Sequence, residues 1–146
     1  MRYFTTNGII LRKQNSGEND WFLTIFSPEH GKIQAISKSS RKISSQKGGH
    51  LDLLNLCEFQ LYKNGSRLLI TECKVKEGFL EIKNDLQKSL YCMHLAEISL
   101  KFIQDDQANL DLFKLLLLTL NEINHGKHHQ LLLEYYKVNL LKLSGL

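Results

Sequence analysis

The sequence lacks most of the features that mark enzymes, metal proteins and membrane proteins. It has one proline and three cysteines, Cys57, Cys73 and Cys92, which are far apart and form no CxxC pair. An odd and scattered set of thiols supports neither a disulfide framework nor a zinc knuckle. No GxSxG, Walker loop, HExxH or paired-carboxylate pattern occurs. We therefore expect no enzymatic activity, no metal site and no cofactor.

Long apolar runs are missing as well. The longest leucine-rich segment, 110–120, contains Lys114 and is well short of the ~20 apolar residues that a membrane span needs. The first residues do not read as a secretory signal, because their apolar run is short and charges follow at once. We expect a cytoplasmic protein with no membrane partner.

Positive charge is in excess, and it is concentrated in the first half of the chain. Residues 1–80 carry twelve Lys and Arg against seven Asp and Glu, whereas residues 81–146 carry seven against eight. No acidic residue lies between Glu29 and Asp52. This predicts a cationic, serine-rich loop able to hold a phosphate backbone. A solvated surface loop is the alternative.

Short apolar and aromatic segments in residues 1–80 predict β-strands at 8–12, 21–26, 32–37, 51–62 and 67–76. Asn64-Gly65 predicts a tight hairpin turn before the last strand, which should carry Leu69, Thr71, Cys73 and Val75 on one side. Five short strands without a long helix predict a closed barrel of the oligonucleotide-binding (OB) type.

The pattern changes to helical after residue 80. Asn84 or Asp85 can cap a first helix, Asn109 or Asp111 can begin a second, and a third covers about 129–143. These helices carry more apolar surface than their own packing would bury. The fold class we predict is α+β: an N-terminal five-stranded OB-type β-barrel, residues 1–80, followed by an all-α helical domain, residues 81–146.

Barrels of this type bind nucleic acid on the face of strands two and three and on two flanking loops, here 14–20 and 62–67. The cations in and beside these regions are the predicted DNA-binding residues: Arg12, Lys13, Lys38, Arg41, Lys42, Lys47, Lys63 and Arg67. Trp21 and Tyr62 are candidates for base stacking, which contributes ~1–3 kcal/mol per base. Phe22 and Phe26 should share one face of their strand and Trp21 the other. We expect the cations to converge on one exposed surface.

The order of these motifs resembles the bacterial recombination mediator family RecO. The resemblance rests on Gly17-Glu18 with Asp20, on Glu29-His30-Gly31-Lys32, and on Ala35, Lys38, Arg41 and Lys42. It covers almost the whole chain and is most specific in the first eighty residues. Family members commonly continue into a segment with zinc-ligand cysteines, so the chain is expected to be either a truncated form or a short relative.

The resemblance implies a nucleoid-associated DNA repair and recombination mediator. Such a protein binds single- and double-stranded DNA, anneals complementary strands and helps RecA load on DNA coated with single-strand-binding protein. RecR and the C-terminal tail of single-strand-binding protein are the implied partners, and the helical domain would hold the tail. Two alternatives stay open: a protein–protein adaptor that works through its leucine-rich helices, and an RNA-binding OB module.

Overall fold

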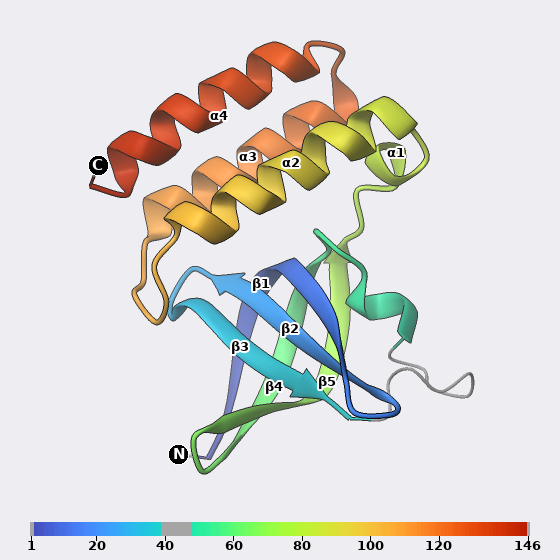
Figure 1. The fold of residues 1–146 in the computed structure, drawn as a ribbon, viewed down its shortest axis with the longest axis vertical. Helices are drawn as coiled ribbons and strands as arrows, with labels where there is room; N and C mark the ends of the chain where they lie inside the picture. Colours follow the sequence, from blue (N-terminus) through green and yellow to red (C-terminus); the bar gives the residue numbers. More distant parts are fainter. Residues whose placement is uncertain (1, 39–47, 146) are drawn as a thin grey trace.

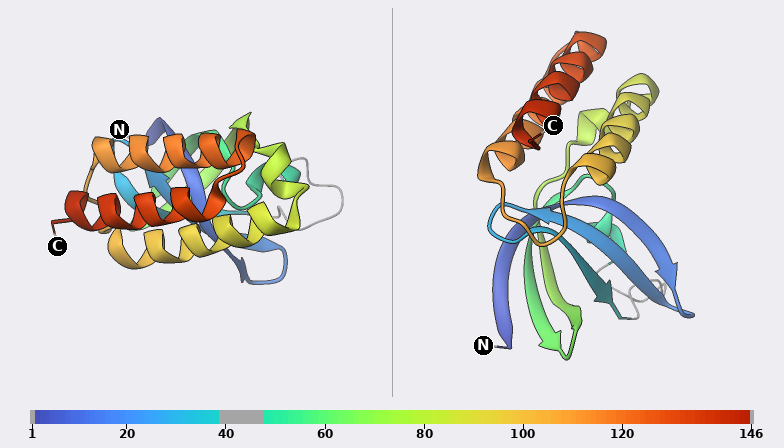
Figure 2. Two further views of the ribbon diagram at one scale, coloured as in Figure 1. Left: turned by 90° about the horizontal axis from the view of Figure 1, so that it is seen from above. Right: turned by 60° about the vertical axis from the view of Figure 1, so that its left-hand side comes forward.

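The computed structural model describes residues 2–38 and 48–145, which form a β-barrel and a group of helices stacked on one end of it (Figure 1, Figure 2). Within these ranges the chain forms five strands, one short 3-10 helix (η1) and four α-helices. Their order is β1 (Tyr3–Ser16), β2 (Asp20–Ser27), β3 (Gly31–Ser37), η1 (Gly48–Leu51), β4 (Leu56–Asn64), β5 (Arg67–Glu77), α1 (Leu80–Lys83), α2 (Leu86–Phe102), α3 (Leu110–His125) and α4 (His129–Leu143). The predicted fold class, an OB-type barrel followed by a helical domain, is confirmed.

The barrel closes because β1 is long enough to pair with two neighbours. Its first half, residues 3–9, pairs antiparallel with β4, and its second half, residues 9–16, pairs antiparallel with β2. β3 pairs antiparallel with β2 and parallel with β5, which gives the closed order β1-β2-β3-β5-β4. Alternate side chains fill the interior: Ile33 and Ala35 of β3 are buried in the barrel core while Gln34 between them is exposed. The strand predicted at 32–37 is confirmed.

A bulge in β5 changes which of its side chains face outward. The pairing with β4 moves from Gln60–Glu72 to Leu61–Ile70, so that Thr71 is an extra residue. The prediction that Leu69 shares a side with Cys73 and Val75 is therefore wrong. Cys73 and Val75 pack against the barrel core, whereas Leu69 lies outside it.

β4 begins five residues later than the strand predicted at 51–62. Residues 48–51 form η1, and Leu54 has a φ of 67°, which no strand accommodates. Two hydrogen bonds to β1 hold this turn. The Leu54 N–H donates to the Ile10 carbonyl at 2.7 Å, and the Ile10 N–H donates to the Asn55 carbonyl at 3.2 Å. The prediction is wrong for 51–55 because this long-range pairing replaces a strand.

Two of the long helices, α2 and α3, begin at caps that the sequence predicted. Asp85 accepts a hydrogen bond from the Lys88 N–H at 3.0 Å before α2, and Asn109 accepts one from the Leu112 N–H at 3.1 Å before α3. Each side chain satisfies an N–H group that the first helical turn leaves unpaired. The additional helix α1 has four residues and is too short to show a helical period in the sequence.

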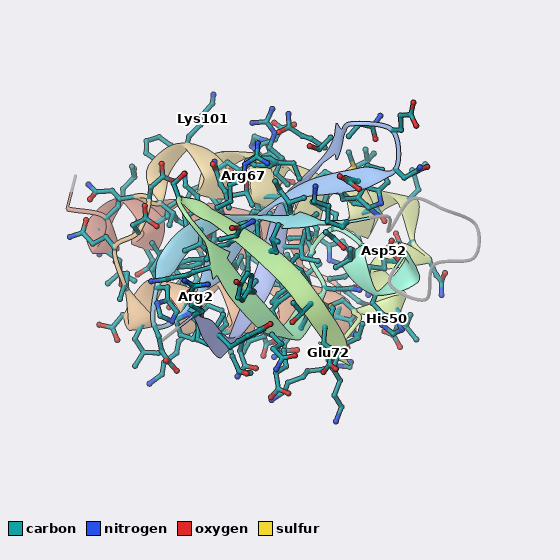
Figure 3. The ribbon with its side chains drawn as sticks, turned by 90° about the horizontal axis from the view of Figure 1, so that it is seen from below. Arg2, His50, Asp52, Arg67, Glu72 and Lys101 are labelled. Atoms are coloured by element: carbon teal, nitrogen blue, oxygen red, sulfur yellow. The ribbon has the colours of Figure 1, made fainter. Side chains whose placement is uncertain are left out.

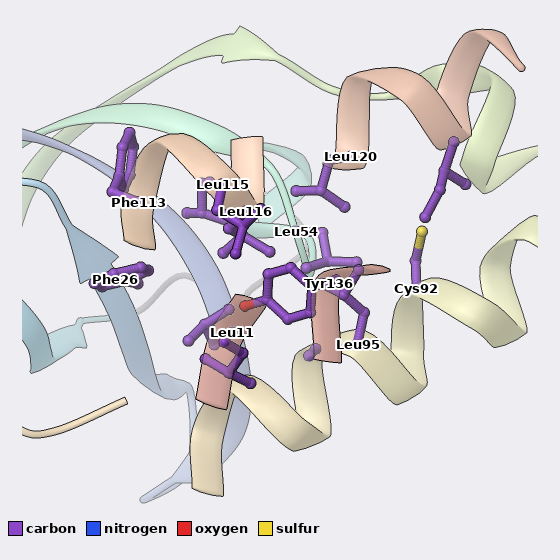
Figure 4. Close-up of a cluster of buried hydrophobic side chains, with 14 of the residues drawn as sticks. Leu11, Phe26, Leu54, Cys92, Leu95, Phe113, Leu115, Leu116, Leu120 and Tyr136 are labelled. Carbon is purple, nitrogen blue, oxygen red and sulfur yellow. The ribbon is translucent and has the colours of Figure 1, made fainter. Parts of the chain in front are cut away.

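One apolar cluster forms the core of the helical domain and joins it to the barrel (Figure 4). Its barrel members include Phe26, whose ring meets that of Phe113 of α3 at a centroid distance of 5.6 Å. Deeper in the cluster, the buried Tyr136 of α4 has its hydroxyl 2.6 Å from Ser99 Oγ of α2. The nearly continuous apolar sequence of α3 is explained by its position between α2, α4 and the barrel.

The turn between β2 and β3 docks on the connection between α2 and α3. Gly31 has a φ of 71° and lies so close to this connection that a Cβ would be 2.3 Å from the Gln107 carbonyl oxygen. Lys32 contributes its backbone and its side chain. Its carbonyl accepts from the Asp106 N–H at 3.0 Å, and its ammonium group donates to the Leu100 carbonyl at 2.6 Å. The Lys32 side chain is 12% exposed, so this cation belongs to the joint between the two parts.

Large apolar side chains remain exposed on all three long helices, as the sequence predicted. They include Leu86, Leu90 and Met93 on α2, Leu110 and Leu118 on α3, and Leu131, Tyr135 and Val138 on α4. None of the helices in the described ranges has both the length and the apolar character that crossing a bilayer takes.

Candidate nucleic-acid interface

The outer surface of β2 and β3 is formed by the side chains that do not point into the barrel core. Leu23 of β2 points inward, so its neighbour Phe22 faces outward, opposite Ile36 of β3. Trp21 takes the inner side and packs against the barrel core. The half-buried ring of Phe22, rather than that of Trp21, is therefore the aromatic surface on the face where OB barrels bind nucleic acid.

Apolar side chains form a row that crosses four strands on the outside of the barrel. Phe22 of β2 pairs with Ile36 of β3, Ile36 with Leu69 of β5, and Leu69 with Tyr62 of β4. None of the four belongs to the barrel or helical apolar cluster; Phe22, Leu69 and Tyr62 are half-buried, whereas Ile36 is only 8% exposed. We call Phe22, Ile36, Leu69 and Tyr62 the outer row. With strands about 4.8 Å apart, it is about 14 Å long.

Three of the predicted DNA-binding cations lie on the same side of the sheet as the outer row. Arg12 faces outward opposite Thr24 of β2. Lys38 follows β3 two residues after Ile36, and Arg67 begins β5 two residues before Leu69, so both share the outward side with the row. Arg12, Lys38 and Arg67 therefore all face the outside of the barrel.

Lys38 is held by a contact that a phosphate can replace. Its side chain is 59% exposed, and its ammonium nitrogen lies 3.7 Å from the carboxylate of Asp20. An exposed ion pair of this kind contributes about 0–1 kcal/mol. Lys38 therefore lies beside the outer row. If it exchanged the Asp20 carboxylate for a nucleic-acid phosphate, the lost ion pair would cost little free energy.

Two other predicted cations, Lys13 and Lys63, point to the inner side and cover the open ends of the barrel core. The ammonium nitrogen of Lys13 lies 4.3 Å from the ring centroid of Trp21 and 3.9 Å from Asp52. Burial lowers the pKa of Lys13, and the charge of Asp52 opposes that shift. Lys63 lies over Phe4, 5.8 Å from its ring centroid. Trp21 and Phe4 both pack against the barrel core, so both lysines lie over rings at the edge of that core, Lys63 with its side chain exposed.

Arg41, Lys42 and Lys47 lie outside the described residues, and their role in DNA binding stays a prediction. The chain enters their segment from Lys38 and leaves it at η1. Lys38 thus connects the serine-rich cationic segment to the outer row.

Phe22 and Arg2 were not among the binding residues predicted from the sequence. Phe22 could have been selected from strand alternation, once Leu23 had been assigned to the core. Arg2 had no local signal, because its position depends on the pairing of β1 with β4. Its Nη1 lies 3.4 Å from the hydroxyl oxygen of Tyr62, to which it donates.

An apolar pocket of 390 Å³ lies between the barrel and the first two helices. Its lining residues are Asp52, Leu53, Leu54, Phe79, Ile82, Lys83, Ser89, Cys92 and Met93. Partial burial lowers the pKa of Lys83, and Asp52 opposes that shift. The Lys83 ammonium group donates a hydrogen bond to the Asn55 side chain. The pocket thus combines an apolar wall with a cation at its edge.

Across residues 2–38 and 48–145, we find no group of three or more His, Cys, Asp and Glu side chains placed to hold a metal ion.

The barrel, its outward cations and the attached helices define the class: OB-barrel proteins that carry a helical domain. Comparison with known proteins gives the family. Residues 1–79 match the family model described as Recombination protein O N terminal, and residues 83–146 match the one described as Recombination protein O C terminal. The chain belongs to the RecO family.

Curated relatives agree with this assignment. The DNA repair protein RecO of Dehalococcoides mccartyi is 39% identical over 142 residues, which cover 97% of this chain and 56% of the relative. The DNA repair protein RecO of Acetivibrio thermocellus is 32% identical over 146 residues, covering 99% of this chain and 58% of the relative. The chain spans a little more than half the length of these relatives.

Proposed function

We propose that the chain binds DNA as part of a non-enzymatic mediator of DNA repair and recombination. The observation that carries this proposal is the outer row with Arg12, Lys38 and Arg67 beside it, on the face where OB barrels bind nucleic acid. The RecO family, whose members compared above are named DNA repair protein RecO, supports it.

The outward cations and the outer row would contribute to DNA binding in different ways. The cations neutralise phosphates and release counterions, an interaction that single- and double-stranded DNA both offer. The outer row offers apolar and aromatic surface to unstacked bases, which only a single strand exposes. Neutralised phosphates repel each other less, so two bound complementary strands can approach and anneal.

The proposal extends to protein partners on the helical domain. The apolar pocket with Lys83 at its edge suits a short peptide that combines apolar side chains with a carboxylate, such as the tail of single-strand-binding protein. Binding this tail, together with RecR, would place the barrel on coated DNA and help RecA load there. The exposed apolar residues of α2 and α4 favour one second function, that of a protein–protein adaptor in which the barrel is a scaffold.

The test is to remove the outward cations and compare the result with an equal loss of charge elsewhere. We expect the double variant Arg12→Gln/Lys38→Gln to bind single-stranded DNA about three- to eightfold more weakly per lost phosphate contact at moderate salt. The matched control is Lys74→Gln/Lys76→Gln, which removes two exposed lysines from β5. Equal weakening by both double variants would show that net charge alone is responsible. An absence of DNA binding, with retention of a protein partner, would favour the adaptor.

A further inference from the structure

Tyr3 extends the outer row from β4 onto β1. It pairs with Tyr62 in the β1–β4 ladder, and the two ring centroids are 4.7 Å apart with the planes inclined at 44°. The Tyr3 side chain is 54% exposed and lies outside both apolar cores. A ring in this position fills no core. It presents an aromatic face to solvent next to a second ring.

Arg2 places a positive charge at the edge of this tyrosine pair. Its guanidinium Nη1 donates to the hydroxyl of Tyr62 at 3.4 Å, and its carbonyl accepts from the Lys63 N–H at 2.7 Å. The second bond holds Arg2 in line with the β1–β4 ladder. Figure 3 shows Arg2 and Arg67 toward one side of the barrel's lower face, away from Asp52. The tyrosine pair therefore has the Arg2 cation beside it.

Resting on the proposed function, we propose that Tyr3 and Tyr62 form a stacking site for an unpaired base of single-stranded DNA, and that Arg2 binds the adjoining phosphate. Because the barrel is closed, the row continues round its wall from Tyr62 on β4 to Tyr3 on β1. The tyrosine pair thus adds a stacking position to the row at the β4–β1 side of the barrel.

The chemistry makes this site selective for unpaired DNA. In a duplex both faces of each base are covered by its neighbours, so a tyrosine ring finds nothing to stack on. Phosphates are present in both forms, so Arg2 alone would not discriminate between them. The tyrosine pair should therefore add affinity for a single strand and none for a duplex.

Tyr3→Ala tests the site, with Tyr3→Phe as the matched control that keeps the ring. We expect Tyr3→Ala to weaken binding of a short single-stranded oligonucleotide about 5- to 100-fold, with Tyr3→Phe close to wild type. Duplex affinity should not change. The dependence of single-strand affinity on salt should keep its slope in Tyr3→Ala, because stacking releases no counterions. Arg2→Gln should reduce that slope by about 0.7, the value for one phosphate contact.

The outcomes separate this inference from the proposed function. If the wild type binds single strands and Tyr3→Ala binds them equally tightly, the stacking site alone is overturned. Equal weakening of single-strand and duplex binding by Tyr3→Ala would also overturn it, because the effect would then not depend on unpaired bases. A wild-type chain that binds neither form of DNA would overturn the proposed function and the stacking site together.

Discussion

Replacing Gly31 by alanine tests the joint between the barrel and the helices. Gly31 opens β3 with a φ of 71°, and an added Cβ would lie 2.3 Å from the carbonyl oxygen of Gln107 and 2.6 Å from its carbonyl carbon. These are backbone atoms, which cannot rotate aside as a side chain can. We expect the connection between α2 and α3 to be pushed away from the β2–β3 turn.

The loss of unfolding free energy expected for Gly31→Ala has two parts, and the same substitution at Gly65 measures one of them alone. A left-handed φ costs a non-glycine residue about 1–2 kcal/mol, and this part applies to both glycines because Gly65 has a φ of 65°. An added Cβ at Gly65 would meet nothing within 4 Å, so the second part is absent there. At Gly31 the forced contact adds about 1–3 kcal/mol, typical of overpacking. We expect Gly31→Ala to lose about 2–5 kcal/mol of unfolding free energy and Gly65→Ala about 1–2.

Denaturant unfolding of the wild type and both variants measures the difference in unfolding free energy. Amide hydrogen exchange shows where in the chain the structure is loosened. The Asp106 N–H, which donates to the Lys32 carbonyl at 3.0 Å, should exchange faster in Gly31→Ala than in Gly65→Ala. If the two variants lost the same stability and protected this amide equally, the close approach of Gly31 to Gln107 would not hold the two parts together.

Two further predictions concern buried titratable groups. Burial raises the pKa of Tyr136 to about 12, against the opposing hydrogen bond from Ser99. The neutral, buried Tyr136 hydroxyl contributes to the unfolding free energy in full below the unfolded pKa near 10. This contribution is lost as pH rises toward 12. The unfolding free energy of the wild type should therefore fall by about 2–3 kcal/mol more than that of Tyr136→Phe over this range. An identical fall in both proteins would contradict this assignment. Burial raises the pKa of Cys92 to about 12, and the pKa of Cys57 is raised by its hydrogen bond with Cys73 and by burial. A thiol reagent at neutral pH should therefore label the half-buried Cys73 in the native protein and the other two only after unfolding; native labelling of Cys57 or Cys92 would show that their sites open.

The sequence predicted the fold well where structure depends on neighbouring residues. Strand alternation in 32–37, the glycine turn at Gly65 and the caps Asp85 and Asn109 are all local features, and the structure has each of them. The start of β4 was wrong because Leu54 and Asn55 bond to β1, far away in the chain. A pattern in nearby residues contains no information about such a partner.

The candidate site was harder to predict because single-residue bulges decide which cations face outward. In β1 the pairing moves from Ile10–Ile25 to Arg12–Thr24. Without this bulge, Arg12 would share the inward side with Ile10, and Lys13 would face outward. The bulge reverses the two. A list of cations drawn from the sequence therefore does not show which of them face outward from the barrel.

The dependence of DNA affinity on salt tests the central claim most directly. A fluorescent single-stranded oligonucleotide titrated at several salt concentrations gives the slope of log affinity against log salt. With about 0.7 per phosphate and roughly three to six phosphates contacted, the account predicts a slope of about −2 to −4. An affinity that does not change with salt would contradict a barrel that binds DNA through Arg12, Lys38 and Arg67.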